Sequence, residues 1–203
     1  MDSRGTHTGA RPRLRARAHA GFTLIESLAA LLIVVMLTSV VVAGVNVGMH
    51  VFRESSFISE STSLADSLDA SIQDPAHFAK GMTYDGEPSY RMDFLGQTLV
   101  DPDLTTHDVS VTEEDGTTRT VSVLALKGIS LSTGKEVTCD LLNAGAYTEC
   151  QVTSAKLEFS PSTAVDGTEP DTVKVTFTIA STVDPTLTKS YTYTYTPSDT
   201  SRL

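Results

Sequence analysis

The chain has 203 residues, of which 40% are hydrophobic and 20% are charged, a composition that excludes a wholly disordered or collagen-like protein. Its 25 acidic and 15 basic residues are unevenly distributed. The first 21 residues contain five arginines and one acid, whereas the remainder contains 10 basic and 24 acidic side chains. Because phosphate contacts require a basic surface, we expect no direct nucleic-acid binding by this acidic remainder.

An uncharged segment follows the basic one. Between Ser27 and Met49, 23 consecutive residues carry no formal charge. As an α-helix they would extend about 35 Å, enough to cross a hydrocarbon core of about 30 Å. Arginines precede the segment and acids follow it, which orients the N-terminus toward the cytoplasm. The sequence therefore predicts a single-pass membrane protein, with a spanning helix over residues 22–50 and an extracytoplasmic C-terminal domain.

One carboxylate, Glu26, lies at the start of this apolar segment. A carboxylate at the centre of a bilayer costs about 2.5–3.5 kcal/mol, and less near the interface, so an acid here is a candidate functional residue. A glutamate in the first turn of a helix is also favoured by the helix dipole alone. Position by itself leaves both interpretations open.

The residues around Glu26 resemble a known processing signal. The hexapeptide GFTLIE, from Gly21 to Glu26, follows a basic leader and precedes an apolar helix. This order is similar to the type III signal of type IV prepilins and type II secretion pseudopilins, over about residues 11–50. The resemblance implies that a prepilin peptidase removes residues 1–21 by cutting between Gly21 and Phe22, and then N-methylates Phe22. It also implies that Glu26 pairs with the terminal amine of a neighbouring subunit during assembly.

Two features depart from that family. The 21-residue leader is longer than is usual for prepilins that begin with Phe, and the helix lacks the proline at which many pilins bend. Gly44 and Gly48 are candidates for supplying flexibility instead, or for close packing against another helix. Cleavage by ordinary signal peptidase after Ala43 is an alternative. Against it, the apolar run exceeds the 7–15 residues usual for such signals, and Glu26 stays unexplained.

The pattern after the membrane segment predicts that the helix continues over residues 51–73. Its apolar residues recur at steps of three, four and seven, which is typical of an amphipathic helix. They are Phe57, Ile58, Leu64, Ala65, Leu68 and Ile72. Asp74-Pro75 predicts the end of the helix, because the residue before a proline is disfavoured in the helical region.

Residues 74–106 are interpreted as a connecting region, and residues 107–203 as a β-rich domain. Val109 and Val111 alternate with polar residues before a turn at 114–117, and Val121 and Val123 alternate after it, which predicts a hairpin. Further strands are expected over 124–132, 136–142, 156–159 and 173–179, with a loop over 161–171. Tyr191, Tyr193 and Tyr195 are expected to share one face of a last strand. The predicted fold class is therefore α+β and pilin-like, with the amphipathic half of the helix packed on an antiparallel sheet.

The two cysteines, Cys139 and Cys150, are placed symmetrically about Ala144-Gly145. A hairpin turning there would set them opposite each other on adjacent strands, close enough for a disulfide. Such a bond is permitted outside the cytoplasm. Two free thiols are the alternative. Metal binding is not expected, because zinc requires four ligands and no histidine lies nearby.

A search for catalytic motifs finds no phosphate-binding glycine loop, no nucleophile elbow and no HExxH sequence. We therefore expect neither an enzyme nor a cofactor. The resemblance implies a structural subunit of a type IV pilus or a type II secretion-type pseudopilus. Its expected partners are prepilin peptidase, other pilin or pseudopilin subunits, the membrane assembly platform and the lipid bilayer. A singly anchored or secreted β domain that binds at the cell surface and does not polymerise is the alternative.

Overall fold

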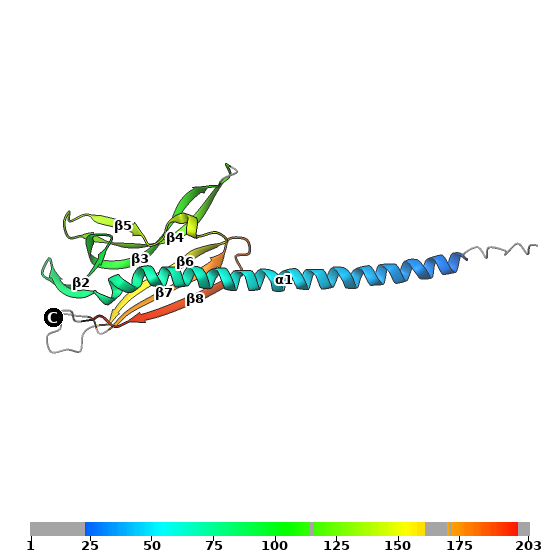
Figure 1. The fold of residues 1–203 in the computed structure, drawn as a ribbon, viewed down its shortest axis with the longest axis horizontal. Coiled ribbons are helices and arrows are strands. Elements are labelled where there is room, and N and C mark those ends of the chain that lie inside the picture. Colours follow the sequence, from blue (N-terminus) through cyan, green and yellow to red (C-terminus); the bar gives the residue numbers. More distant parts are fainter. Residues whose placement is uncertain (1–22, 114–115, 161–169, 171, 199–203) are drawn as a thin grey trace, which may run out of the picture. The chain divides into compact units, whose positions relative to one another are not determined.

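A computed structural model describes residues 23–113, 116–160, 170 and 172–198 (Figure 1). The chain divides into two compact units, residues 1–49 and 50–203. In the described residues the elements are α1 (Leu24–His77), β1 (Lys80–Tyr84), β2 (Glu87–Phe94), β3 (Gln97–Thr112), β4 (Thr118–Ser130), β5 (Glu136–Asp140), the short 3₁₀ helix η1 (Ala144–Ala146), β6 (Cys150–Ser160), β7 (Thr172–Ser181) and β8 (Thr188–Tyr195). A long apolar helix followed by antiparallel sheets is an α+β arrangement, as the sequence predicts.

The two parts of α1 differ in burial. The described residues of the first unit are exposed along the whole helix, whereas the part that belongs to the second unit buries one face. The buried positions are Phe57, Ser61, Leu64, Ala65, Leu68, Ile72, Pro75 and Ala76. Their spacing of three and four residues places them on one side of the helix, as an amphipathic pattern requires. Ile58, which the pattern also assigned to this face, is 46% exposed.

The helix ends later than predicted. It continues through Pro75 to His77, and the N–H of Phe78 donates to the carbonyl of Asp74 at 3.2 Å. A proline disfavours helical geometry in the preceding residue but does not forbid it. Because Pro75 is itself buried, packing in the core compensates for this local preference.

The second unit contains two antiparallel sheets. Sheet A has the strand order β1-β2-β3-β4-β5, and sheet B has the order β6-β7-β8. Buried side chains from α1 and from both sheets form one hydrophobic cluster. Its fully buried members include Leu68 and Ile72 in α1, Leu99, Leu124 and Leu126 in sheet A, and Phe177 and Ile179 in sheet B. The core of the unit therefore lies where the helix and the two sheets meet.

Residues 74–106 are not the connecting region that the sequence predicted. Apart from the end of α1, they form β1, β2 and the first part of β3. Asp85 and Gly86 connect β1 to β2, and Leu95 and Gly96 connect β2 to β3, all four with positive φ. Such pairs are typical of two-residue turns between antiparallel strands. A shift of register between Val100 and Asp103 interrupts the pairing of β3 with β4. Because of this interruption, the sequence shows no regular alternation of apolar and polar residues that would have predicted the strand.

The hairpin predicted around residues 114–117 is confirmed by the pairing of β3 with β4. Val109 lies opposite Val121, and His107 opposite Val123. The N–H of Glu113 donates to the carbonyl of Thr117 at 2.8 Å, and Gly116 has a φ of 82°. The strand expected over 124–132 is the continuation of β4, and the one expected over 156–159 is part of the longer β6. The predicted loop at 161–171 lies, except for Pro170, outside the described residues.

The predicted hairpin between the cysteines is wrong. Cys139 lies in β5 of sheet A and pairs with Leu126, whereas Cys150 lies in β6 of sheet B and pairs with Ser181. Both are free thiols, so the expected disulfide is not formed. Between them, η1 begins at Asn143, whose side chain accepts the N–H of Gly145 at 2.9 Å. The symmetric spacing that suggested a turn within one sheet instead belongs to a crossover between two sheets.

Strand β8 connects sheet B to α1 through hydrogen bonds of its tyrosines. Its tyrosines share one face, as predicted, and alternate with exposed threonines. The hydroxyl of Tyr191 donates to Ser61 Oγ at 3.0 Å, and the hydroxyl of Tyr195 donates to the carboxylate of Asp69. The face that the tyrosines share is therefore the face of β8 that packs against α1.

Candidate functional site

The candidate assembly site begins at the N-terminal end of α1. Thr23 precedes the helix, and its side-chain Oγ1 accepts the backbone N–H of Glu26 at 3.3 Å. The carbonyl of Thr23 accepts the N–H groups of Glu26 and Ser27 at 3.0 and 3.1 Å. Thr23 is therefore the N-cap of α1, and Thr23 and Glu26 have the spacing of a capping box. Gly21 and Phe22, the predicted cleavage and methylation residues, lie outside the described residues.

Glu26 is exposed and lies in the first turn of α1. A negative charge in this position interacts favourably with the helix dipole, by about 0.3–1 kcal/mol at an exposed site. The geometry is thus sufficient for a capping role. It also leaves the carboxylate available to a cation from another molecule, because no ion pair within the described residues engages it.

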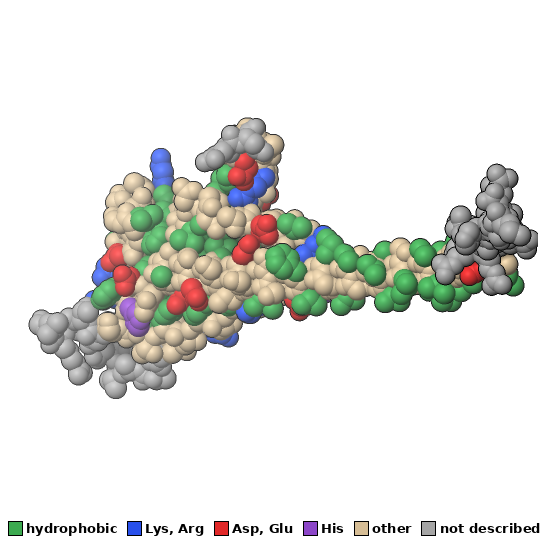
Figure 2. Space-filling view, turned by 45° about the vertical axis from the view of Figure 1, so that its right-hand side comes forward, with side chains coloured by type: hydrophobic (Ala, Val, Ile, Leu, Met, Phe, Trp, Pro, Cys, Tyr) green, Lys and Arg blue, Asp and Glu red, His purple; other side chains and the backbone are tan. Residues whose placement is uncertain are grey.

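The helix beyond Glu26 is long and apolar enough to cross a membrane, by length and composition. Figure 2 shows hydrophobic side chains along this part of α1. Its hydroxyl groups bond within the helix: Thr38 Oγ1 donates to the carbonyl of Val34, and Ser39 Oγ to that of Met36, both at 2.7 Å. Intrahelical bonds of this kind satisfy polar groups where water is absent.

Gly44 and Gly48 both lie in this helical part. A Cβ added at either position would meet no atom within 4 Å. Their predicted role, in flexibility or in packing against another helix, stays a prediction.

A polar groove, which no motif in the sequence indicates, lies on the outer face of sheet A. Its lining is Leu95, Thr105, His107, Lys127, Glu136, Thr138 and Asp140. His107 Nε2 lies 3.3 Å from Asp140 Oδ1, and Lys127 Nζ lies 3.0 Å from Glu136 Oε2. The other ring nitrogen of His107 is buried and has no partner among the described residues. These residues are remote in sequence, and only the register of β3, β4 and β5 brings them together.

The groove is open to solvent and lined mostly by polar side chains. Its two ion pairs are both about half exposed, so each contributes little to stability and can exchange for a polar ligand. No nucleophilic hydroxyl or thiol is hydrogen-bonded to His107 in the described part of the chain. A histidine that activates a nucleophile of the protein requires such a group within hydrogen-bond distance.

Cys150 and Glu60 lie at a second site, which is more enclosed than the groove. They line a cavity of about 130 Å³ beside Ser63 and Thr148. Burial, and then the charges of Glu60 and Glu149, raise the pKa of the Cys150 thiol to about 11. Burial, and then the charge of Glu149, raise the pKa of Glu60, one of whose oxygens has no hydrogen-bond partner among the described residues. A protonated thiol and a poorly solvated carboxyl are suited to packing and not to thiolate chemistry.

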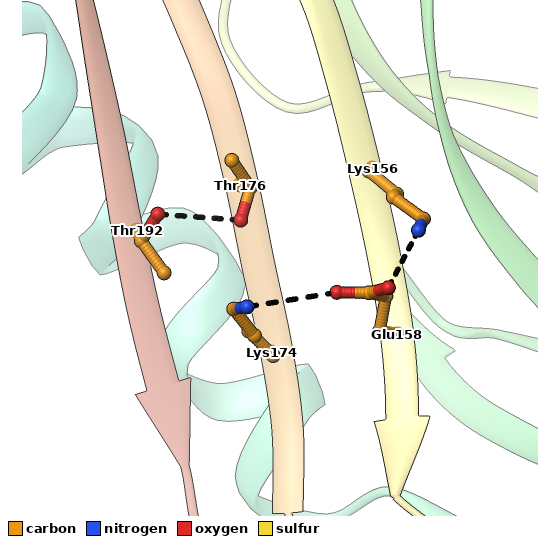
Figure 3. A network of polar contacts seen from close by, with 5 residues as sticks. All are labelled: Lys156, Glu158, Lys174, Thr176 and Thr192. Atoms are coloured by element: carbon orange, nitrogen blue, oxygen red, sulfur yellow. Dashed lines mark hydrogen bonds and ion pairs between the residues drawn. The ribbon is translucent and has the colours of Figure 1, made fainter.

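The outer face of sheet B carries polar side chains (Figure 3). Glu158 accepts from Lys156 on the same strand, and lies 3.8 Å from Lys174 on the next. Across β7 and β8, the hydroxyls of Thr176 and Thr192 lie 3.3 Å apart. Cross-strand pairs of this kind stabilise a solvated sheet face. Among the described residues, no group of three or more His, Cys, Asp or Glu side chains is placed to hold a metal ion.

No protein-family model, curated protein or solved structure matches this chain.

Proposed function

We propose that this chain is a pilin-like structural subunit of a type IV pilus or a type II secretion-type pseudopilus, processed by prepilin peptidase and assembled through its N-terminal helix. One observation carries the proposal: α1 begins at Leu24, within the GFTLIE sequence, has Glu26 in its first turn, and continues as a charge-free apolar run from Ser27 to Met49. In a plain membrane anchor this carboxylate would serve only the start of the helix, and it would add a cost of insertion.

The local geometry supports a role for Glu26 in assembly. Cleavage after Gly21 would make Phe22 the first residue, immediately before the N-cap Thr23. The new terminal amine would then be four residues before Glu26 in the sequence, close to the start of the helix that carries this carboxylate. In lipid, each charge favours pairing with an opposite charge. Two subunits at a suitable axial offset would exchange these partners.

In this proposal the apolar part of α1 forms the polymer, and the second unit is displayed on it. The amphipathic part of α1 is held by the core and by β8, so a polymer built from the apolar parts would carry the β sheets with it. In this proposal the chain is first a single-pass membrane protein with its N-terminus in the cytoplasm, and then part of a filament. Its partners are prepilin peptidase, other pilin or pseudopilin subunits and the membrane assembly platform.

A second candidate is an anchored or secreted β domain that binds at the cell surface and does not polymerise. The polar groove around His107 and Asp140 favours this alternative, because a subunit with only a structural role has no need of one. The two candidates differ in the N-terminus of the mature protein and in its presence in filaments.

Mass spectrometry of the N-terminal peptide from membrane-derived protein tests the proposal. We expect a mature chain that starts at N-methylated Phe22, and an uncut chain when Gly21→Val removes the small residue before the cut. A mature chain that begins at Gly44, or one in which residues 1–21 are retained in the unaltered protein, would contradict the proposal. Sheared filaments from the same cells should contain the processed protein, whereas the second candidate predicts its absence there.

A further inference from the structure

The loop between β7 and β8, residues 182–187, packs beside the first turns of α1 in the second unit. Phe52 and Arg53 of the helix line a cavity of about 140 Å³ together with Val183 and Asp184 of the loop. Farther along the helix, Ile58 lines a second cavity with Leu187. Two hydrogen bonds from Thr186, and then the charges of His50 and Arg53, lower the pKa of Asp184. The loop and the helix are therefore neighbours within this unit.

Hydrogen bonds hold the loop in one conformation. The N–H groups of Val183 and Asp184 both donate to Ser181 Oγ at 3.2 Å. The N–H of Leu187 donates to the carbonyl of Asp184 at 3.0 Å, and that of Thr182 to the carbonyl of Glu149 at 2.9 Å. In spite of this ordered backbone, the Val183 side chain is 64% exposed. The loop thus presents an apolar side chain outward.

Phe52, on the other side of the cavity, is 74% exposed. Two large apolar side chains are therefore exposed around one small cavity, next to a cation, Arg53. Apolar groups beside a basic residue are typical of surfaces that meet a membrane interface.

The position of this surface along the chain indicates what covers it. The charge-free run ends at Met49, and Phe52 is three residues beyond it, about 4.5 Å along a helix. The headgroup layer on each side of a bilayer is about 5–8 Å thick, because the whole bilayer measures about 40–45 Å and its hydrocarbon core about 30 Å. If residues 27–49 cross the membrane, Phe52 and Arg53 lie among the headgroups, and so does the loop beside them.

We propose that the β7–β8 loop rests on the lipid surface, with Val183 and Phe52 among the headgroups and Arg53 directed to their phosphates. This inference rests on the membrane insertion required by the proposed function, but not on cleavage or polymerisation. The contact holds the β sheets against the membrane until the subunit leaves it. Arg53 offsets part of the negative charge that Asp184, Glu60 and Glu149 bring to the same cavity.

The absence of tryptophan from the sequence makes the test direct, because one substitution supplies a single probe. Full-length Val183→Trp protein is reconstituted into vesicles of phosphatidylcholine and phosphatidylglycerol that carry a quencher either on the headgroup or deep in the acyl chain. Phe78→Trp is the matched control: Phe78 is 46% exposed but lies 26 residues beyond Phe52, about 40 Å along the helix. Val42→Trp reports insertion of the apolar run.

We expect the emission of the Val183→Trp protein to shift to shorter wavelength on reconstitution, with loss of intensity to the headgroup quencher. The Phe78→Trp protein should show neither change, and the Val42→Trp protein should respond to the acyl-chain quencher. If Val42→Trp is quenched and Val183→Trp is not, the loop does not touch lipid, and the inference fails while membrane insertion stands. If neither is quenched, insertion and the inference both fail. A blue shift that grows with protein density and is not accompanied by quenching would assign the surface to a second copy, and would also overturn the inference.

Discussion

The hydroxyl of Tyr195, near the end of the last strand, donates a hydrogen bond to the carboxylate of Asp69 in α1. The two residues are 126 positions apart in sequence, and Tyr195 is only 7% exposed. A hydrogen bond to a carboxylate is stronger than one between neutral groups. This contact therefore contributes more than its neighbours to holding sheet B against the helix.

We expect Tyr195→Phe to lower the free energy of unfolding by about 1.5–3 kcal/mol, the range for hydrogen bonds to charged groups, with the half-buried Asp69 favouring the lower end. Urea unfolding of the full chain in detergent, followed by circular dichroism, measures the change. Tyr191→Phe is the control, since its hydroxyl donates to the neutral Ser61 and its loss should cost about 0.5–1.5 kcal/mol. A smaller loss for Tyr195→Phe than for Tyr191→Phe would contradict the prediction.

Alkaline pH should destabilise the second unit. Burial raises the pKa of Tyr147, which accepts the N–H of Leu124, to about 12, and burial together with Asp69 raises the pKa of Tyr195 strongly. An unfolded tyrosine ionises near pH 10, so between pH 10 and the folded pKa the native state binds more protons. The contribution of these two tyrosines to stability is then complete below about pH 10, and above it falls by up to about 1.4 kcal/mol per pH unit for each of them.

Urea unfolding between pH 8 and pH 11 checks this dependence. The Tyr195→Phe protein should lose stability less steeply above pH 10, because one of the contributing tyrosines is gone. Equal slopes for the two proteins would show that Tyr195 is not protected from ionisation in the native state.

Elements with a local periodic signal could be predicted from the sequence. The spacing from Phe57 to Ile72 indicates the buried side of α1, and the alternation around Val109 and Val121 indicates the β3–β4 hairpin. Where the local signal was interrupted, prediction failed. Asp101 has a φ of 48° and precedes Pro102, at the point where the register of β3 shifts, so the strand reads as a turn.

Contacts that depend on the order and register of the strands could not be predicted from local sequence patterns. The equal spacing of Cys139 and Cys150 about Ala144-Gly145 fits a hairpin and a crossover equally well, and only the pairing of β5 with β4 and of β6 with β7 decides between them. The groove that joins His107 to Asp140 has the same origin, because strand register and not sequence spacing places these side chains together.

The two cysteines should differ in reactivity. Cys139 lies half-buried in the edge strand β5, whereas Cys150 is 2% exposed and has a pKa of about 11. At pH 8 Cys150 is therefore almost entirely the thiol, whereas the thiolate is the form that reacts. We expect iodoacetamide to label Cys139 in the folded protein without reductant, and Cys150 only after unfolding.

Peptide mapping after timed alkylation measures both rates, and Cys139→Ser should abolish the fast phase. If neither cysteine is labelled until a reductant is added, the two are oxidised and the free-thiol assignment is wrong.

Replacing Leu95 should stabilise the protein. Leu95 has a φ of 49° and is 74% exposed, so it adopts a left-handed conformation without gaining burial. That conformation costs most L-residues about 1–2 kcal/mol, and asparagine less. We expect Leu95→Asn to raise the free energy of unfolding by roughly 0.5–1 kcal/mol, within the cost of the left-handed conformation.

Urea midpoints measure this gain, and Gly96→Ala is the opposite control, since its φ of 74° is unfavourable for a residue with a Cβ. Lower stability for Leu95→Asn would show that the exposed leucine makes a contact that offsets its backbone cost.

The last prediction separates the capping role of Glu26 from a role of its charge in assembly. Glutamine at the third helical position still satisfies a capping box, so Glu26→Gln keeps the helix start but removes the charge. Thr23→Ala has the opposite effect: it removes the side-chain acceptor of the Glu26 N–H, at a cost of about 1 kcal/mol, and keeps the carboxylate. If Glu26 pairs with a neighbour's terminal amine in lipid, Glu26→Gln leaves that amine buried and unpaired in the filament, at a cost of about 3–5 kcal/mol.

We therefore expect Glu26→Gln protein to be inserted and cut after Gly21, but to be recovered in sheared filaments at roughly one hundredth of the normal amount or less. Thr23→Ala protein should be recovered nearly normally. Normal recovery of Glu26→Gln, or an equal loss with Thr23→Ala, would mean that Glu26 acts on its own helix and not on a neighbouring subunit.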